Sequence, residues 1–570
     1  MTTEITSKVK SSNLKSHLIF HLLGVPASFL FTSYFSNFHP GYIQFIFLVL
    51  CSQILFGTGG YLILQGAYEK LSVSWRNTWA SILVLIVVGT LAVSSVLISW
   101  QFPGLFNQRL VSMGESLLPA FFGLTTLSTP VVLWLIGRIE KGRLPFIEEA
   151  RFTRYMQRNR AGIFLAILFF LTYFTFTQSV NFPGYYTRDQ YFETDISDWI
   201  KRLTASPTEE ILPVRSVHPA VLLILRPLTG LLSVLMNGDK LQAAFMLSAL
   251  AGSACVFMTW MIVKQRTGST PYALISASLL GASASHLLLS SMLETYIFSA
   301  LALVSFCYLL QTDRISLKST VPMGVVIFGI TITNLAQACI LYFLKLPRVK
   351  VMIQFIGSVV LTAILLNVIQ VRLYSFSRPF YDPSSLLSEQ KYRYTLFETP
   401  GRFGGRVNQI SRAILLHGMV APDPFILTDE LGVSVPNFRT FKIAAGELQV
   451  AGYKGLADVT AKIWIAILGL AIILFIFNLL KSPVQMVFPA GLVLCMGFSF
   501  GLHLLYGDDP MLYSPNWVYA LVLFVSVSFE RWSHNKWIQA GLIVFLGLMT
   551  CINLGLLHRI MNVSLPFYGG

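Results

Sequence analysis

Charged residues are scarce in this sequence. Asp, Glu, Lys and Arg make up 12% of its 570 residues, hydrophobic residues make up 54%, and the mean hydropathy is +0.66. Soluble domains carry about twice that fraction of charge, because most of their surface faces water. The composition therefore excludes an ordinary soluble domain and indicates a polytopic membrane protein.

Cysteine is scarce as well, and none lies in a polar loop. All six cysteines fall in apolar segments: Cys51, Cys255, Cys307, Cys339, Cys495 and Cys551. A disulfide framework or a zinc site would need cysteines at characteristic spacings in polar stretches. The sequence indicates neither.

Acidic residues are fewer than basic ones, and the net charge is +15. The basic residues lie mostly in short gaps between apolar runs, as the positive-inside rule describes. No soluble stretch combines a basic stripe with interleaved aromatic residues, so nucleic acid is not an expected partner. The sequence also contains no heptads, no low-complexity tract and no obvious internal duplication.

Five apolar runs open the chain. Those near 17–36, 42–66, 78–100 and 117–137 each approach the ~20 residues that a helix needs to cross the hydrocarbon core. Basic clusters follow the second and the fourth run, which predicts a cytoplasmic N-terminus and two cytoplasmic gaps. The fifth run, about 162–180, then leads outward. The polar stretch after it is therefore expected on the extracytoplasmic side.

The next apolar run, 219–236, is interrupted by Arg226 and a proline. If it crossed the membrane, Lys264 and Arg266 would lie on the outer face, so a juxtamembrane or re-entrant element is predicted instead. Spans near 270–290 and 294–311 follow, and the alternation continues to the C-terminus. The run 320–347 is expected to form two short helices that meet at an outer turn. The predicted fold is an all-α transmembrane bundle of about 15 helices.

This layout predicts four parts of the chain. They are an N-terminal four-helix extension with a basic cytoplasmic linker (1–161), a core (162–373) whose first large external loop with juxtamembrane helices spans 181–239, a second large external loop (374–459) and the C-terminal helices (460–570). The second loop is too short and too poor in apolar periodicity to predict a separate domain.

The first external loop holds a dense group of charges. Four acids fall within ten residues, and three basic residues follow around the start of the next apolar run: Asp189, Glu193, Asp195 and Asp198, then Arg215, His218 and Arg226. A carboxylate facing arginines beside a bilayer suits group transfer from a lipid phosphate. The carboxylate accepts the proton of the acceptor hydroxyl, and the arginines stabilise the departing phosphate. Sugar transfer fits, because nearby negative charge stabilises an oxocarbenium-like transition state.

Four short segments carry a resemblance: Phe192-Glu193-Thr194-Asp195, Arg215-Ser216-Val217-His218-Pro219, Glu294-Thr295-Tyr296 and Leu512-Tyr513-Ser514. In this order, across about 162–557, the chain resembles the GT-C class of integral-membrane glycosyltransferases, and within it the bacterial members similar to family 39. That class uses polyprenyl-phosphate-linked donors and places a catalytic Asp or Glu in the first extracytoplasmic loop, ahead of juxtamembrane helices. The commonest pattern has an Asp-Glu or Asp-Asp pair soon after the first helix. This loop lacks such a pair, which leaves more than one acid as the base.

The resemblance implies transfer of a sugar from a polyprenyl-phosphate donor to a lipid, glycan or protein acceptor, with inversion, at the outer face of a bacterial inner membrane. It implies that Asp195 or Asp189 is the catalytic base. The implied donor-phosphate ligands are Arg215, His218 and Arg226, and the implied substrate-binding residues are Glu193, Glu294, Tyr296, Asn334 and His503. Several members of the class need a divalent metal such as Mg²⁺ or Mn²⁺ and many do not, so no cofactor and no metal ligand is assigned.

Each candidate also has an ordinary structural interpretation. Asp195 could cap a loop helix over 198–204. His218 could be the entry residue of the next helix, and Arg226 could extend its charged end to the membrane interface. A further pair, Asp508 and Asp509, could bind a metal, but adjacent acids point in different directions on most backbones, so a solvated turn is expected.

Other functional classes stay open. A transporter or flippase of a lipid-linked or anionic substrate would place broken helices and charges at mid-membrane, usually in two related halves, whereas the polar residues here gather at one face. A scaffold or lipid-binding protein would need no carboxylate. A phosphoethanolamine or acyl transferase would need a nucleophilic Thr or Ser with metal ligands, or a His-Asp pair, and the outer loops contain no clear metal cluster.

Overall fold

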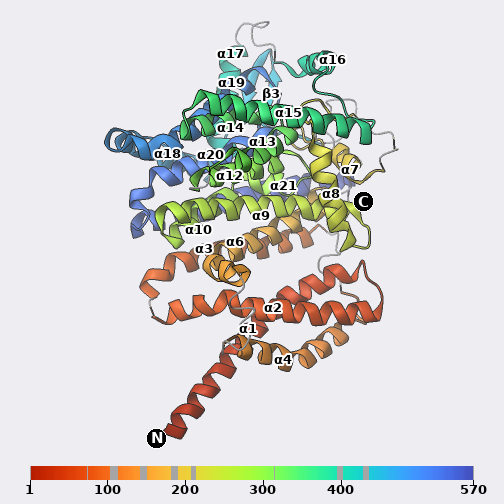
Figure 1. Ribbon diagram of the computed structural model, residues 1–570, viewed down its shortest axis with the longest axis vertical. Helices are drawn as coiled ribbons and strands as arrows, with labels where there is room; N and C mark the ends of the chain where they lie inside the picture. The colour runs from red at the N-terminus through yellow and green to blue at the C-terminus, as the bar shows by residue number, and fades with distance from the viewer. Residues whose placement is uncertain are drawn as a thin grey trace. The chain divides into compact units, whose positions relative to one another are not determined.

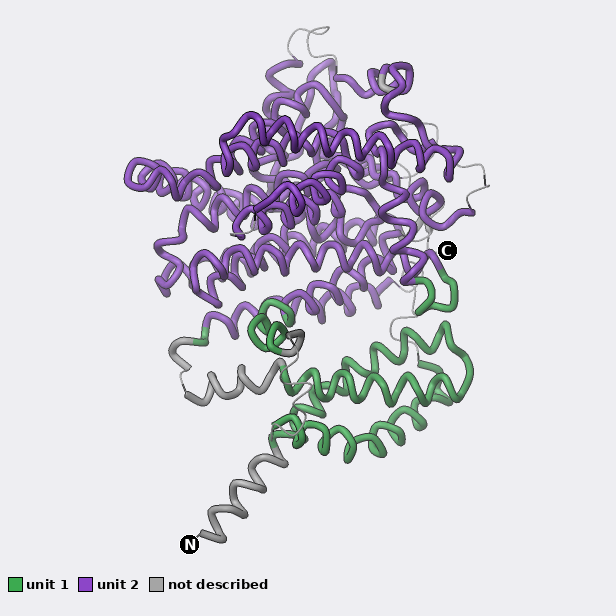
Figure 2. Tube along the Cα trace, in the orientation of Figure 1, with its two compact units in different colours: residues 1–79, 107–164, 233–239 green, residues 80–106, 165–232, 240–570 purple. Residues whose placement is uncertain are grey.

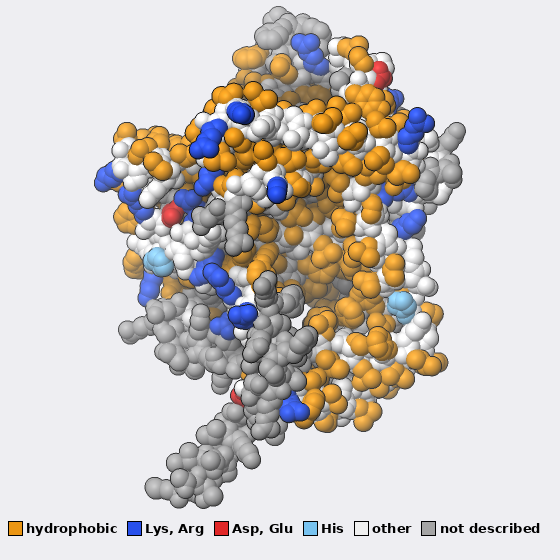
Figure 3. Space-filling view, in the orientation of Figure 1, with side chains coloured by type: hydrophobic (Ala, Val, Ile, Leu, Met, Phe, Trp, Pro, Cys, Tyr) orange, Lys and Arg blue, Asp and Glu red, His pale blue; other side chains and the backbone are white. Residues whose placement is uncertain are grey.

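The chain is a helical, polytopic membrane protein, as its computed structural model shows (Figure 1). The structure describes residues 2–73, 75–102, 113–140, 151–181, 190–206, 209, 213–312, 315–394, 402–427 and 436–568. Within them, ten helical segments are long and apolar enough to cross a membrane: Ser16–Ser36, Tyr42–Leu62, Thr78–Trp100, Leu118–Glu140, Arg154–Val180, Lys240–Thr267, Val349–Leu373, Leu456–Lys481, Pro483–Leu505 and Lys536–Ser564. Hydrophobic side chains cover wide areas of the surface (Figure 3), as lipid-facing helices require.

Four further helices are apolar but shorter: α8 (Val221–Val234), α12 (Tyr296–Gln311), α13 (Leu317–Ile330) and α20 (Pro515–Ser528). The predicted total of about fifteen spans is therefore not confirmed. The run 219–236, for which a juxtamembrane or re-entrant element was predicted, contains the short α8. The two helices predicted over 320–347 are α13 and α14 (Asn334–Lys345).

The other described helices have these bounds: α1 (Thr2–Ser36), α2 (Tyr42–Val73), α3 (Trp75–Trp100), α4 (Leu118–Glu140), α6 (Arg151–Val180), α7 (Ile196–Thr204), α9 (Lys240–Thr267), α10 (Thr270–Gly281), α11 (Ala284–Leu289), α15 (Val349–Leu373), α16 (Pro383–Leu387), α17 (Arg402–Arg412), α18 (Leu456–Lys481), α19 (Val487–Leu505) and α21 (Lys536–Tyr568). Short 3-10 or π turns are η2 (Ser388–Tyr392), η3 (Ala413–His417), η4 (Pro483–Met486), η5 (Pro510–Tyr513) and η6 (Glu530–Trp532).

The single span predicted near 270–290 is two helices, α10 and α11. The break has a local cause, because the Ser283 hydroxyl accepts a hydrogen bond from the backbone N–H of His286 at 3.3 Å and so begins a new helix. The prediction of one continuous span was wrong here.

The second predicted loop contains the described β-structure. Strands β1 (Phe425–Leu427) and β2 (Asn437–Arg439) pair antiparallel, as do β3 (Phe441–Ala444) and β4 (Glu447–Val450). Ala445 and Gly446 join β3 to β4 with positive φ angles of 52° and 82°, the backbone that a tight two-residue hairpin turn needs. The all-α prediction therefore omitted two small sheets.

The chain divides into two compact units (Figure 2). Unit 1 comprises 1–79, 107–164 and 233–239, and unit 2 comprises 80–106, 165–232 and 240–570. The domain boundaries expected from the sequence stay predictions.

Within unit 1, polar side chains join facing helices. Gln53 Nε2 of α2 donates to Thr125 Oγ1 of α4 at 2.8 Å, and His21 of α1 lies 2.9 Å from the hydroxyl of Thr129. Apolar burial gives helices little mutual attraction in lipid, where hydrogen bonds and close packing hold them together. These bonds therefore set how α1, α2 and α4 pack.

Unit 2 is built around α20, in which every residue is buried. Helices α9, α10, α12, α18 and α19 pack against it. Hydrogen bonds join it to Gln337 of α14: Tyr519 donates to Gln337 Oε1 at 2.7 Å, and Gln337 Nε2 donates to the carbonyl of Asn516 at 3.1 Å. A central helix needs no polar face, which explains its uniformly apolar sequence.

Close approach at Gly252 of α9 yields a stability prediction. A Cβ there would overlap the Ser290 hydroxyl and lie 2.9 Å from Cε2 of Tyr173. Gly252→Ala should therefore lower the free energy of unfolding by about 1–3 kcal/mol, measured by thermal or denaturant unfolding of the purified protein in detergent. Gly547→Ala is the matched control, since its Cβ would meet no atom within 4 Å. Equal stability of the two variants would contradict this packing.

Candidate functional site

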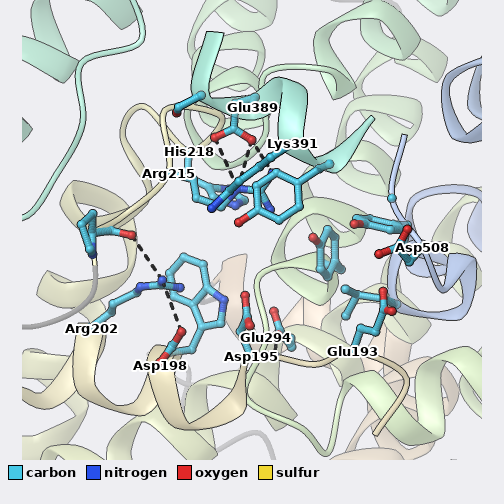
Figure 4. Close-up of a pocket in the computed structure, with 18 of the residues that line it drawn as sticks. Glu193, Asp195, Asp198, Arg202, Arg215, His218, Glu294, Glu389, Lys391 and Asp508 are labelled. Atoms are coloured by element: carbon cyan, nitrogen blue, oxygen red, sulfur yellow. Dashed lines mark hydrogen bonds and ion pairs between the residues drawn. The ribbon is translucent and has the colours of Figure 1, made fainter. Parts of the chain in front are cut away.

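A cavity of about 490 Å³ lies within unit 2 (Figure 4). Its described lining includes six acids and five bases: Glu193, Asp195, Asp198, Glu294, Glu389 and Asp508, with Arg202, Arg215, Arg378, Lys391 and Arg439. All of these residues come from helix ends or connecting segments. The cavity therefore lies at one end of the helices, where charge can meet water, and not in their apolar middle.

The chain turns sharply where the first external loop enters the cavity. Phe192 and Glu193 both have positive φ angles, 55° and 64°. Residues other than glycine rarely adopt this conformation, which costs roughly 1 kcal/mol each. The turn buries Phe192, whose N–H donates to the carbonyl of Phe438 at 2.8 Å. It leaves Glu193 at the cavity in an ion pair with Arg439.

Asp195 and Glu294 lie side by side on one wall (Figure 4). Asp195 occupies the N-cap position of α7, but its side chain makes no capping hydrogen bond. Its backbone N–H instead donates to the carboxylate of Glu294, which also accepts the N–H of Thr295 at 3.2 Å. The capping role considered for Asp195 is thus not the one the structure gives it.

Glu294 is only 3% exposed. Burial raises the pKa of its carboxyl well above the usual value, and the adjacent Asp195 carboxylate raises it further. Two such acids do not ionise independently, so the pair holds one proton more readily than two isolated carboxyls would. The pair therefore keeps a proton to a higher pH than an isolated carboxyl would.

The next turn of α7 carries a neutralised acid. Asp198 lies 3.7 Å from Arg202 one helical turn on, and both side chains are buried. Arg202 lies over the ring of Trp199 at 4.8 Å and donates to the carbonyl of Pro213 at 3.3 Å. This ion pair closes one side of the cavity.

Arg215 ties three segments together. It donates to Glu389 of η2, with Nε 3.1 Å from Oε2, and to the hydroxyl of Tyr506 after α19, while the ring of Tyr392 lies 3.8 Å from its Cζ. Burial alone would lower the pKa of Arg215, but the hydrogen bonds and charge of Glu389 raise it above the usual value. The guanidinium therefore stays charged, as a phosphate ligand must be, although Glu389 already neutralises it.

Two exposed cations adjoin Glu389. Lys391 lies 4.7 Å from the ring centre of Tyr392, and Arg378 Nη1 donates to the hydroxyl of Ser388 at 3.1 Å. Both residues line the cavity. Lys391 lies on the side of η2, opposite Asp195 and Glu294 (Figure 4). Nothing in the local sequence separates these two residues from the other basic residues of the second loop, so neither was predicted as a site residue.

His218 lines the cavity in a neutral form. Burial lowers its pKa to about 3, helped by the charges of Arg215 and Arg202. Its Nδ1 lies 2.6 Å from the carbonyl oxygen of Ile330, which can only accept, so Nδ1 carries the proton. The other nitrogen, Nε2, is then an acceptor. That arrangement does not suit the phosphate-binding role expected for His218.

Two aromatic candidates lie on or behind the wall. Tyr296 lines the cavity, with its ring 5.1 Å from that of Tyr513. His503 lies behind, with its ring centre 4.5 Å from that of Tyr513 and the two rings tilted by 31°, and its Nδ1 is 3.2 Å from the carbonyl of Tyr506. His503 is not among the lining residues and instead supports Tyr513.

Two other candidates are not brought to the cavity. Arg226 donates to the carbonyl of Ala205 and lies 4.8 Å from the ring of Tyr374, and Asn334 donates to Asn516 at 3.0 Å in the core. Neither is a lining residue. Asp189 lies outside the described residues.

The two acids of the Asp508 and Asp509 pair differ in exposure. Asp509 is fully buried and accepts hydrogen bonds from the N–H and hydroxyl of Thr440 at 2.7 and 2.6 Å and from Met511 N–H at 3.0 Å. Burial still raises its pKa. Asp508 lines the cavity. The expectation of a solvated turn holds for the exposed Asp508 and is wrong for Asp509, which the second loop covers through Thr440.

Among the residues that the structure describes, no three His, Cys, Asp or Glu side chains are grouped so that they could hold a metal ion. No protein-family model matches the chain, and no curated protein or solved structure is significantly similar to it. The cavity residues themselves are therefore the basis on which a function can be inferred.

The raised pKa of Glu294 predicts a pH dependence. Above the ordinary glutamate pKa of about 4.3 the folded state keeps a proton that the unfolded state has lost, so this group makes stability fall as pH rises toward its raised pKa. Glu294→Gln cannot lose that proton. The thermal midpoint of Glu294→Gln minus that of wild type should therefore increase as pH rises from about 5 to 8. Below about pH 4 this increase should be absent.

The matched control is Glu447→Gln on β4, an exposed residue outside the cavity. Its midpoint should follow wild type at every pH. A Glu294→Gln midpoint that runs parallel to wild type over the same range would contradict a protonated Glu294.

Proposed function

We propose that the protein is a membrane glycosyltransferase, which transfers a sugar from a polyprenyl-phosphate donor to a lipid, glycan or protein acceptor. The observation that carries the proposal is the cavity at the helix ends in which the Asp195 and Glu294 carboxyls face the cation Lys391. The distribution of basic residues supports an extracytoplasmic cavity and a cytoplasmic N-terminus. The resemblance to bacterial members of the class supports a bacterial inner membrane as its location.

The proposed reaction is a single displacement. The carboxylate of Asp195 accepts the proton of an acceptor hydroxyl, whose oxygen forms a bond to the anomeric carbon of the donor sugar. The bond from that carbon to the phosphate oxygen breaks, and polyprenyl phosphate departs with the electron pair. Attack opposite the leaving group inverts the anomeric configuration.

The basic wall suits the departing phosphate. Lys391 and Arg378 are exposed and adjoin the same 3-10 turn, so an incoming phosphate can reach them without breaking the buried bond between Arg215 and Glu389. Charge-assisted hydrogen bonds to phosphate are stronger than neutral ones. We therefore assign donor-phosphate binding first to Lys391 and Arg378, with Arg215 behind them.

Neutral His218 takes a different role. Its Nε2 can accept a hydrogen bond from a sugar or acceptor hydroxyl, whereas a phosphate offers no proton to it at neutral pH. Tyr296 supplies an aromatic surface on the same side as Glu294. These residues would orient the sugar between the two walls.

A transporter is the competing function. Its substrate site would be expected near mid-membrane, formed by broken helices in related halves. The cavity instead takes its charges from α7, η2 and the ends of α12 and α19. That position favours a transferase, whose lipid substrate presents its phosphate at the membrane surface.

The first prediction of the mechanism concerns Asp195. Asp195→Asn should reduce transfer by about 10²- to 10⁴-fold while donor binding stays within about twofold, because only the proton acceptor is lost. The assay is transfer of radiolabelled sugar from a panel of polyprenyl-phosphate sugars by the purified protein in nanodiscs, with Asp189→Asn alongside. Asp458→Asn, an exposed acid paired with Lys462, should retain wild-type activity.

Two outcomes would contradict this prediction. If the panel contains no sugar that the wild type consumes or binds, the glycosyltransferase proposal loses its support. If Asp189→Asn abolishes transfer and Asp195→Asn does not, the base is misassigned.

The second prediction concerns the basic wall. Lys391→Gln should lower kcat/KM for the donor by about tenfold or more, because one cation at the leaving phosphate is lost. Lys462→Gln is the charge-matched control, because the Lys462 side chain is 72% exposed. It should leave kcat/KM unchanged. A Lys391→Gln enzyme with wild-type kcat/KM would remove Lys391 from the phosphate site.

A further inference from the structure

A second cavity lies at the other ends of the same helices. It has a volume of about 390 Å³ and is lined by Gln311, the last residue of α12, and by Val487 and Gly491 in the first turns of α19. The first cavity adjoins the opposite ends of both helices. At a rise of about 1.5 Å per residue, helices of 16 and 19 residues separate the two cavities by about 24–28 Å, close to the thickness of the hydrocarbon core. The second cavity therefore lies near the opposite membrane surface.

The inner walls of this cavity are apolar. Leu341 and Leu344 of α14 face Phe488 and Gly491 of α19. A Cβ at Gly491 would lie 3.0 Å from Cδ2 of Leu341 and 3.2 Å from Cδ1 of Leu344. Because Gly491 has no side chain, α14 and α19 pack closely at this point and form the floor of the cavity.

The outer rim is rich in hydrogen-bond donors. Gln311 Nε2 is buried and has no hydrogen-bond partner among the described residues, although it lines the cavity. Lys345 adds an exposed ammonium at the end of α14. Buried donors in native proteins nearly always have a partner, so an unpartnered one beside a cation points to a missing acceptor.

The remaining charges leave the rim positive. Glu530 accepts two hydrogen bonds from Arg266, at 3.0 and 2.8 Å, and so neutralises it. Arg531 follows directly and donates to Ser482 at 3.2 Å, next to the η4 segment that lines the cavity. The rim therefore complements an anion.

We propose that this cavity binds one anionic phospholipid, such as phosphatidylglycerol. An acyl chain lies in the cavity against its apolar walls, and the phosphate accepts hydrogen bonds from Gln311 and Lys345. The apolar walls would gain nothing from a free anion, and a lipid without net charge would leave the positive rim uncompensated. The inference does not depend on the proposed sugar transfer, which concerns the other cavity.

The test is native mass spectrometry of the full chain in detergent, with added phosphatidylglycerol or phosphatidylcholine of the same acyl chains. Wild type should retain one phosphatidylglycerol at least about fivefold more strongly than phosphatidylcholine, the preference expected from one cation near an anionic lipid. Gly491→Leu should lose this bound lipid by filling the cavity. Gly497→Leu in the same helix, where a Cβ meets no atom within 4 Å, should keep it.

A second variant guards against misfolding of Gly491→Leu. Lys345→Gln alters only an exposed side chain and should reduce the preference for phosphatidylglycerol toward that for phosphatidylcholine. Equal retention of the two lipids by wild type would overturn the proposal. Unchanged selectivity in Lys345→Gln would overturn it as well, since the lipid would then be bound elsewhere on the apolar surface.

Discussion

One buried arginine, Arg406, holds the second loop onto the end of α19. It is 1% exposed, and its guanidinium donates to four backbone carbonyls at the exit of that helix: His503 (2.6 Å), Tyr506 (3.3 Å), Gly507 and Asp508 (2.9 Å). The last carbonyls of a helix have no partner within it and form the negative end of its dipole. A cation at this point satisfies both needs, and it fixes the direction in which the chain leaves α19.

That direction decides what the cavity contains. Because the exit is fixed, Tyr506 meets Arg215 from the first loop, Asp508 reaches the lining, and Asp509 accepts the hydrogen bonds of Thr440. The short strand β2 then presents Arg439 to Glu193. Three segments distant in sequence thus converge through bonds to backbone as much as through contacts between side chains.

The part of the site that could be predicted from the sequence came from its scarce charged residues. In a chain with so few charges, Asp195, Glu294 and Arg215 stand out, and the structure brings all three to one cavity. Apolar length likewise indicated a polytopic helical fold, but not the break at Ser283, which depends on one hydroxyl. Lys391 could not be singled out, because its loop holds many basic residues and only the packing of η2 around Arg215 selects it.

The arrangement of charged residues in the cavity suits the proposed transfer. Three ion pairs neutralise Glu193, Asp198 and Glu389, while the Asp195 and Glu294 carboxyls and the ammonium of Lys391 lie on opposite walls. Charges held apart in a site of low effective dielectric create a field between the walls that water would otherwise cancel. In the proposed reaction a proton moves to the acidic wall and negative charge collects on the departing phosphate at the basic wall. The fixed charges stabilise both movements at once, and because the fold already holds them in place, little reorganisation accompanies the step.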